Sequence, residues 1–138
     1  MSGIVTGAPK VLLRLEGLFV LIAAPAAYAR LGASWWIFAI LFLAPDLSML
    51  GYLAGRKTGA AIYNVGHWYG LPIACIAWGM LGRSPQVLAL GLIWCAHIGL
   101  DRALGYGLKY PDGFGFSHLG LIGKARSTAK RRPAGGME

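Results

Sequence analysis

Apolar residues along the chain gather into four long runs separated by short polar breaks. The runs cover roughly residues 11–30, 35–55, 59–82 and 86–107, and the breaks read RLGAS, GRKTG and GRSPQ. Each run is long enough for a helix to cross the hydrocarbon core of a bilayer, which takes about 20 residues. Glycine together with a basic residue in each break is typical of a tight turn between helices. The pattern predicts an all-α fold, a bundle of four transmembrane helices.

Composition agrees with a membrane protein and excludes a nucleic-acid-binding function. Hydrophobic residues make up 57% of the 138 and charged residues only 13%, with a mean hydropathy of +0.58. The formal charge of +8 comes from residues that flank the apolar runs and do not form one basic and aromatic face. Cys75 and Cys95 stand alone inside apolar runs, so they give no disulfide or zinc signature.

The distribution of basic residues predicts the orientation of the bundle. An even number of spans places both termini on one side, and cytoplasmic loops carry the excess of lysine and arginine. Ten basic residues fall on the terminal side and two on the other: Lys10, Arg14, Arg56, Lys57, Lys109, Lys124, Arg126, Lys130, Arg131 and Arg132 against Arg30 and Arg83. We therefore expect both termini to be cytoplasmic.

The chain divides into a four-span membrane domain with a juxtamembrane loop over residues 1–123 and a basic, flexible cytoplasmic tail over 124–138. Membrane lipids are the expected partners, with anionic headgroups contacting the basic tail. A cleavable signal peptide ending near Ala29 is an alternative reading of the first run. Glu16 argues against it, so we expect the first helix to be retained.

Polar residues in three of the predicted spans fall in two layers, with Asp46, His67 and His97 at one depth and Asn64 and Asp101 in a second layer about one turn nearer the cytoplasm. Asp46, His67 and His97 each lie about eight to ten residues from the cytoplasmic end of their own span. At 1.5 Å per residue this is a depth of roughly 12–15 Å. Asn64 precedes His67 by three residues and Asp101 follows His97 by four, spacings that place each pair on one helix face. The five side chains are therefore expected to converge inside the bundle.

Such a cluster has three possible roles, which the sequence leaves open. Asp46, His67, His97 and Asp101 can ligate a divalent metal such as Zn, Mn or Fe and form a catalytic site, with Asn64 orienting the ligands or a substrate. The same groups can relay protons or a cation in a small carrier. They can also serve only as interhelical hydrogen bonds.

Two further polar residues are candidate binding groups. Arg102 is expected to extend toward the cytoplasmic headgroups, or alternatively to pair with Asp101 or Asp46. The glycine-rich segment KYPDGFGFSHLGLIGK can fold back as a lid over the cluster and bring His118 close as a fifth ligand. A loop histidine of this kind is more often simply solvated.

Proline and glycine positions predict the local shape of the helices. Pro45 and Pro72 lie inside spans, where each deprives the carbonyl four residues earlier of its hydrogen bond and can open the backbone near the cluster. Small residues at four-residue spacing, such as Gly51 with Gly55, Gly66 with Gly70 and Gly99 with Ala103, allow close helix contacts and make a homodimer possible.

The segments LFLAPDLSMLGYLAG, YNVGHWYGLP and AHIGLDRALGYGLKYPDGF together resemble a bacterial family of small integral membrane proteins, the domain of unknown function 4260. The resemblance covers roughly residues 10 to 124. It implies a multi-pass protein of the bacterial inner membrane and supplies no established activity.

The chain is more loosely similar to membrane-bound metal-dependent hydrolases that carry an H-x-x-x-D pattern followed by glycine and proline. His97, Asp101 and Pro111 follow that order, with Gly105 or Gly107 between them, and PDLS at 45–48 resembles the acidic helix motif of those enzymes. Their histidine-rich H-R-x-x-x-H-S segment is reduced here to Asn64 and His67.

Overall fold

The computed structural model describes residues 3–123 and 125–127, and these are mostly helical. In chain order the elements are α1 (Gly7–Arg30), α2 (Trp35–Phe42), a 3-10 helix η1 (Ala44–Ala54), α3 (Arg56–Gly66), α4 (Gly70–Leu81), α5 (Pro85–Leu104) and two short strands, β1 (Phe116–Ser117) and β2 (Gly120–Leu121). The strands pair antiparallel. Lys124 and residues 128–138 of the predicted tail lie outside the described residues.

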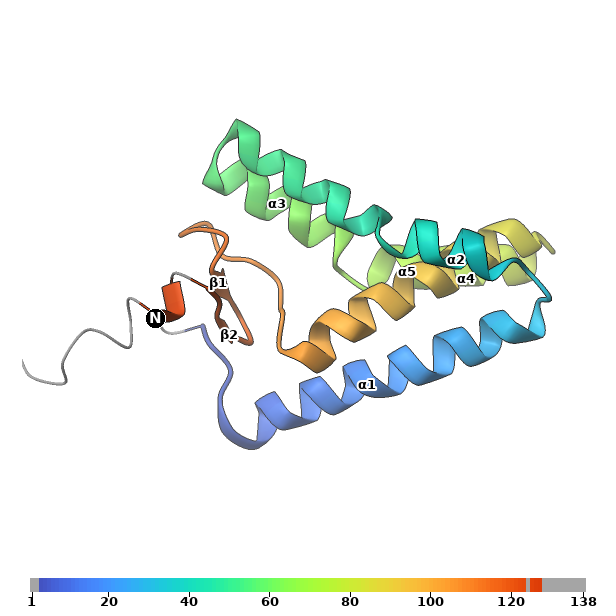
Figure 1. Ribbon diagram of the computed structural model, residues 1–138, viewed down its shortest axis with the longest axis horizontal. Helices are drawn as coiled ribbons and strands as arrows, with labels where there is room; N and C mark the ends of the chain where they lie inside the picture. Colours follow the sequence, from blue (N-terminus) through green and yellow to red (C-terminus); the bar gives the residue numbers. More distant parts are fainter. Residues whose placement is uncertain (1–2, 124, 128–138) are drawn as a thin grey trace, which may run out of the picture.

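The long helices α1 and α5 run side by side and form the base of the molecule (Figure 1). Gly17 and Gly99 allow their backbones to touch, because a Cβ added at Gly17 would lie 2.8 Å from the Gly99 oxygen, and one at Gly99 would lie 2.7 Å from the Gly17 oxygen. Gly51 likewise faces Ile62 of α3. The predicted small-residue contacts at Gly51 and Gly99 therefore occur between helices of one chain.

Proline interrupts the second and third apolar runs next to the predicted cluster. The second run changes from α-helix to 3-10 helix between Phe42 and Ala44, directly before Pro45. The third run is divided where α3 ends at Gly66 and α4 begins at Gly70. Pro72 lies in the first turn of α4, where its ring no longer clashes with a preceding helical carbonyl. The predicted opening of the backbone is confirmed.

Three stretches in the described part of the chain have the length and hydropathy of membrane spans: Gly7–Arg30, Trp35–Ala54 and Pro85–Leu104. The run at 59–82 does not form a continuous fourth helix of that length, because the break at His67 divides it. Large apolar side chains remain on the outer surface, among them Phe19, Trp36 and Leu53 at 72%, 81% and 88% exposure. Such a surface fits a lipid environment.

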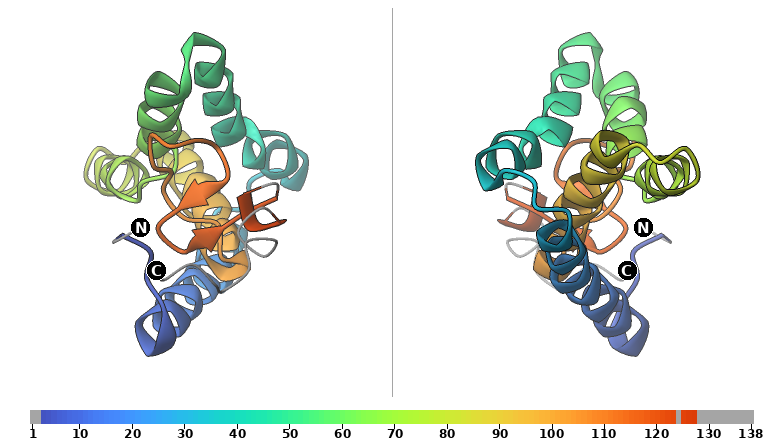
Figure 2. Two further views of the ribbon diagram at one scale, coloured as in Figure 1. Left: turned by 90° about the vertical axis from the view of Figure 1, so that its left-hand side faces the viewer. Right: turned by 90° about the vertical axis from the view of Figure 1, so that its right-hand side faces the viewer.

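The two ends of the described chain meet at one end of the molecule. The backbone N–H of Val5 donates to the His118 oxygen at 2.8 Å, and the Tyr110 hydroxyl donates to the Gly3 oxygen. The segment after α5 turns back and carries the β1–β2 hairpin, which Figure 2 shows across the end of the helices. This places the N-terminal residues and the C-terminal hairpin next to the same end of α5.

Candidate metal centre

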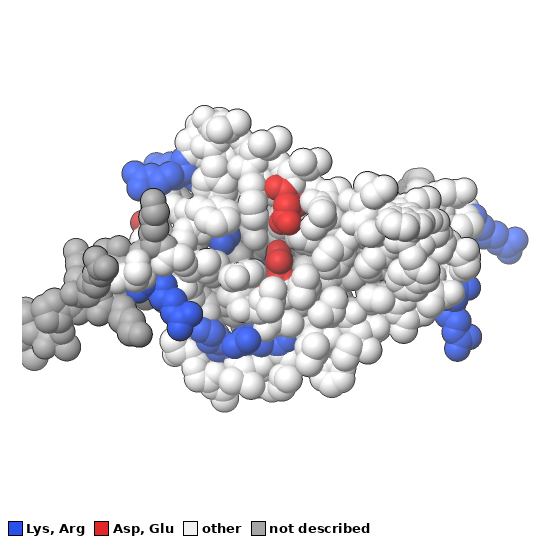
Figure 3. Space-filling model, viewed as in Figure 1, with Lys and Arg blue, Asp and Glu red and all other residues white. Residues whose placement is uncertain are grey.

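Four of the predicted site residues come together from three elements. Asp46 lies in the first turn of η1, His67 lies at the break between α3 and α4, and His97 and Asp101 lie one turn apart on α5. The histidine side chains are only 1% and 3% exposed, whereas those of Asp101 and Asp46 are 15% and 39% exposed. Figure 3 shows acidic groups reaching the surface near the middle of one face, among uncharged side chains. The cluster is therefore buried on its histidine side and open on its carboxylate side.

Five of the six separations between the ligand atoms of these four residues are nearly equal. One atom from each residue lies within 4.8 Å of all the others. Five of the six separations lie between 3.1 and 3.4 Å: His67 Nε2 to His97 Nε2 is 3.1 Å, His97 Nε2 to Asp46 Oδ1 is 3.3 Å, and His67 Nε2 to Asp46 Oδ1, His67 Nε2 to Asp101 Oδ2 and His97 Nε2 to Asp101 Oδ2 are 3.4 Å. Zinc bonds to nitrogen and oxygen of about 2.0–2.2 Å require tetrahedral edges of about 3.3–3.6 Å. Five of the six edges thus match a metal-sized tetrahedron, and the sixth, between the Asp46 and Asp101 oxygens, is within 4.8 Å.

Neighbouring groups fix the ring of His67 with Nε2 toward the cluster. Its Nδ1 lies 2.9 Å from the Tyr63 carbonyl oxygen, which can only accept, so Nδ1 carries the proton. The Tyr63 ring stacks on the imidazole with centroids 3.8 Å apart. The Ser48 hydroxyl lies 3.4 Å from Nδ1 and donates to the Pro45 oxygen at 2.6 Å. The lone pair of Nε2 is therefore available to a cation, the arrangement usual for a metal-ligating histidine.

A cavity of about 300 Å³ opens onto the two carboxylates. Its wall consists of Asp46 and Asp101 together with mostly aromatic and apolar side chains, namely Met49, Tyr63, Tyr106, Phe114 and Ile122, and one cation, Lys109. The segment after α5 thus folds back over the cluster, as the sequence predicted for a lid.

Lys109 is the functional group that the sequence reasoning missed. Its side chain is only 4% exposed, and its Nζ lies 4.2 Å from the Phe114 ring centroid and 5.2 Å from that of Tyr63. Burial lowers the pKa of Lys109 from 10.5 to about 8. In the sequence it is a single lysine after a span, indistinguishable from one that only sets topology.

Asn64 holds the backbone of Lys109 in place. Its Nδ2 donates to the Lys109 oxygen at 2.9 Å, and the Lys109 N–H donates to Asn64 Oδ1 at 2.6 Å. The predicted second-layer residue therefore contacts the returning segment through both halves of its amide. It positions Lys109 over the cavity and does not itself face the four ligand atoms.

Arg102 and His118 lie elsewhere than expected. Arg102 is 8% exposed and donates to the oxygens of His67 and Tyr106 at 3.0 and 3.2 Å. Its guanidinium therefore caps backbone carbonyls inside the protein and does not extend to headgroups. His118 Nδ1 accepts from the Leu108 N–H at 2.9 Å, burial lowers the pKa of its imidazole, and His118 is not among the four clustered residues.

Comparison with known proteins places the chain in a family without indicating an activity. No curated protein and no solved structure matches it. The family model described as domain of unknown function DUF4260 matches residues 10–122, which is most of the chain and includes all four clustered residues. The chain therefore belongs to the DUF4260 family.

Proposed function

We propose that Asp46, His67, His97 and Asp101 bind one divalent metal ion and that this centre carries out hydrolysis of a small or lipid-like substrate. The observation that carries the proposal is the set of five ligand-atom separations between 3.1 and 3.4 Å. Two carboxylates and two imidazoles from three elements thus lie within 4.8 Å of one another around one position.

Electrostatics favour an ion at this position. Asp46 and Asp101 place two carboxylates beside two histidines that are almost wholly buried. The two carboxylate oxygens lie within 4.8 Å of each other, so their negative charges repel and a positive charge between them is favourable. A divalent cation neutralises both while the histidines stay neutral, and the mixed nitrogen and oxygen donors suit Zn, Mn or Fe. The tetrahedral spacing favours Zn among these.

The cavity supplies the other requirements of hydrolysis. Asp46, His67, His97 and Asp101 would hold a Lewis acid that lowers the pKa of a water, and that water would enter on the side of Asp46, the most exposed ligand, as a fifth ligand or in its place. Asp46, the most exposed of the four, and Asp101 both face the cavity, so a substrate oxygen can approach from that side. Water adds across an ester bond, which breaks to give an acid and an alcohol. Lys109, with its pKa lowered to about 8, is placed to donate the proton that the departing alcohol oxygen takes up.

The membrane arrangement that fits these features keeps four crossings, with α3, the break and α4 forming an interrupted third span. Non-helical backbone at membrane depth is tolerated where it is buried in protein. The meeting of Val5 with His118 supports both termini lying on one side. The excess of basic residues there supports a cytoplasmic side.

Metal content tests the proposal directly. The full-length protein in detergent is loaded with Zn, Mn or Fe, freed of unbound metal and measured by elemental mass spectrometry. We expect about one metal per chain in the wild type. His97→Ala should bind little, because it removes one of the four metal ligands. His118→Ala is the matched histidine control and is expected to keep its metal, since His118 bonds to Leu108.

A wild type that binds none of the three metals would overturn the metal centre. A metal-loaded protein that hydrolyses none of a series of p-nitrophenyl carboxylate and phosphate esters of increasing chain length would overturn the hydrolytic part alone. Metal-dependent proton flux in sealed vesicles would then identify the centre as that of a carrier.

A further inference from the structure

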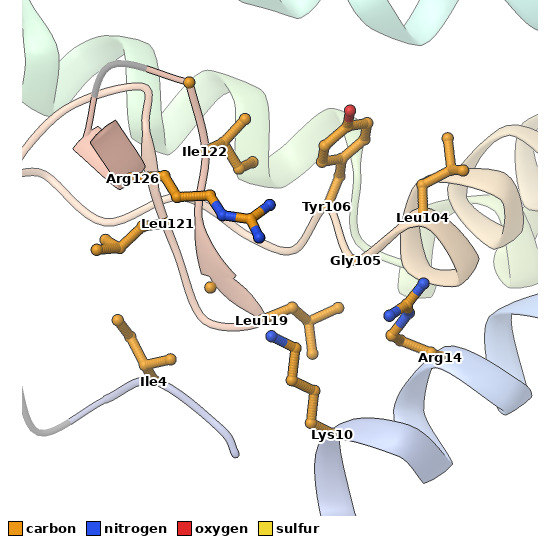
Figure 4. A pocket seen from close by; sticks show the side chains of 12 residues that line it. Ile4, Lys10, Arg14, Leu104, Gly105, Tyr106, Leu119, Leu121, Ile122 and Arg126 are labelled. Carbon is orange, nitrogen blue, oxygen red and sulfur yellow. The ribbon is translucent and has the colours of Figure 1, made fainter. Parts of the chain in front are cut away.

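A second cavity, separate from the metal centre, lies where the start of α1 meets the β1–β2 hairpin. Its volume is about 650 Å³. Three cations line it: Lys10 and Arg14 come from α1, and Arg126 comes from the segment after the hairpin. Figure 4 shows their charged groups directed toward one opening. Three side chains of the same charge from two distant parts of the chain thus share one space.

The cavity lacks the groups that would neutralise these cations. Its lining contains no acidic residue, and every ion pair between described residues involves the four groups of the metal centre. The Arg14 Nε donates to the Ala103 oxygen at 2.9 Å, which fixes the guanidinium at the rim of the cavity. Bringing three cations together without a counter-charge is unfavourable, so the site is electrostatically complementary to an anion.

Gly120 leaves room in the cavity beside the Lys10 ammonium group. Gly105, Gly120 and Gly123 line it and have φ angles of +88°, +143° and +57°. A Cβ added at Gly120 would lie 3.2 Å from Lys10 Nζ. A side chain there would therefore crowd the ammonium group, and the backbone angle also disfavours one.

An apolar groove continues from the basic cavity along α1 and α5. It has a volume of about 320 Å³ and is lined by Val11, Leu15, Leu18 and Ala103, together with Arg14. Arg14 is the one residue that lines both spaces. The charged cavity lies at the end of the helix pair and the groove follows the membrane-length helices. This is the order in which a lipid presents its headgroup and its acyl chain.

We infer that the cavity binds the phosphate group of an anionic phospholipid, with one acyl chain lying in the groove between α1 and α5. Lys10, Arg14 and Arg126 contact the phosphate, and Arg14 marks the passage from headgroup to chain. The apolar groove, contiguous with the cations, favours a lipid over free phosphate. The site does not depend on a metal at Asp46, His67, His97 and Asp101.

Binding of short-chain lipids to the full-length protein in neutral detergent tests this inference. Dihexanoyl-phosphatidylglycerol, dihexanoyl-phosphatidylcholine and inorganic phosphate are titrated separately, and the bound fraction is read by native mass spectrometry. We expect phosphatidylglycerol to bind most tightly. The double variant Lys10→Gln with Arg14→Gln should bind it about 30-fold more weakly, since each basic group near a lipid surface contributes a factor of about five.

The matched control is Arg30→Gln with Arg83→Gln, which removes the same charge at the end of α1 and after α4, away from the cavity. It should bind phosphatidylglycerol like the wild type, and Leu18→Gln should weaken phosphatidylglycerol without changing binding of inorganic phosphate. Equal loss in both double variants would overturn the site, because binding would then reflect net charge alone. Inorganic phosphate binding as tightly as the lipid would overturn the lipid assignment. If the Lys10 and Arg14 double variant loses its helical circular dichroism, the single variant Lys10→Gln is compared with the wild type instead.

Discussion

Replacing His67 by alanine removes one corner of the proposed metal tetrahedron and three of its five short edges. These edges run from His67 Nε2 to Asp46, Asp101 and His97, at 3.4, 3.4 and 3.1 Å. Because a tetrahedral edge is about 1.63 times the distance from centre to corner, edges of 3.1–3.4 Å imply metal–ligand bonds of about 1.9–2.1 Å. The wild type should therefore show four nitrogen and oxygen neighbours at that distance, two of them imidazoles.

X-ray absorption at the zinc edge measures these quantities, because outer-shell scattering counts the histidines. In His67→Ala the imidazole count should fall from two to one. The zinc affinity should fall by more than the 10–100-fold that loss of a supporting residue around a metal typically costs. The reasoning fails if the wild type shows six ligands at longer distances or sulfur scattering, or if His67→Ala keeps two imidazoles.

Two further predictions concern residues that support the centre. Burial lowers the pKa of Lys109 from 10.5 to about 8, so the folded protein binds fewer protons than the unfolded chain between those values, and stability should rise with pH across that window. NMR titration of methyl-labelled lysines, with Lys109→Arg to assign the signal, should give a midpoint near 8 for Lys109. A midpoint at 10.5 would contradict its buried position. Arg102→Met loses its donors to the His67 and Tyr106 oxygens, so zinc affinity should fall about 10–100-fold while helical circular dichroism is kept. Partial recovery in Arg102→Lys is expected, and unchanged affinity in Arg102→Met would show that the cap does not position His67.

Much of the cluster could be predicted because helix geometry is regular. Counting from the span ends placed Asp46, His67 and His97 at one depth, and the spacing of four placed Asp101 on the same face as His97. The structure brings all four within 4.8 Å of one another. Counting residues from the span end still gave the right depth for His67, because His67 lies only one position beyond the end of α3. Residues on or beside regular helices are thus accessible to this reasoning.

The rest depends on how irregular segments return to the helices. Residues 59–82 were predicted as one span because hydropathy is averaged over side chains. That average contains no information on the backbone break before Pro72. Lys109 reaches the cavity only after the chain reverses beyond α5, and no periodicity in that glycine-rich segment predicts its path. Arg126 meets Lys10 and Arg14 for the same reason. Such contacts require three-dimensional information.

Helix α5 explains how a broken helix and a metal-sized site coexist. Ending α3 at Gly66 leaves carbonyls without the hydrogen bonds of a continuing helix, which is costly in an apolar environment. Trp94 Nε1 donates to the Gly66 oxygen at 2.6 Å and Arg102 to the His67 oxygen at 3.0 Å. Both donors lie on α5, the helix that carries His97 and Asp101. The bonds that satisfy the broken backbone therefore also fix His67 relative to the two ligands of α5, so the break and the site depend on one another.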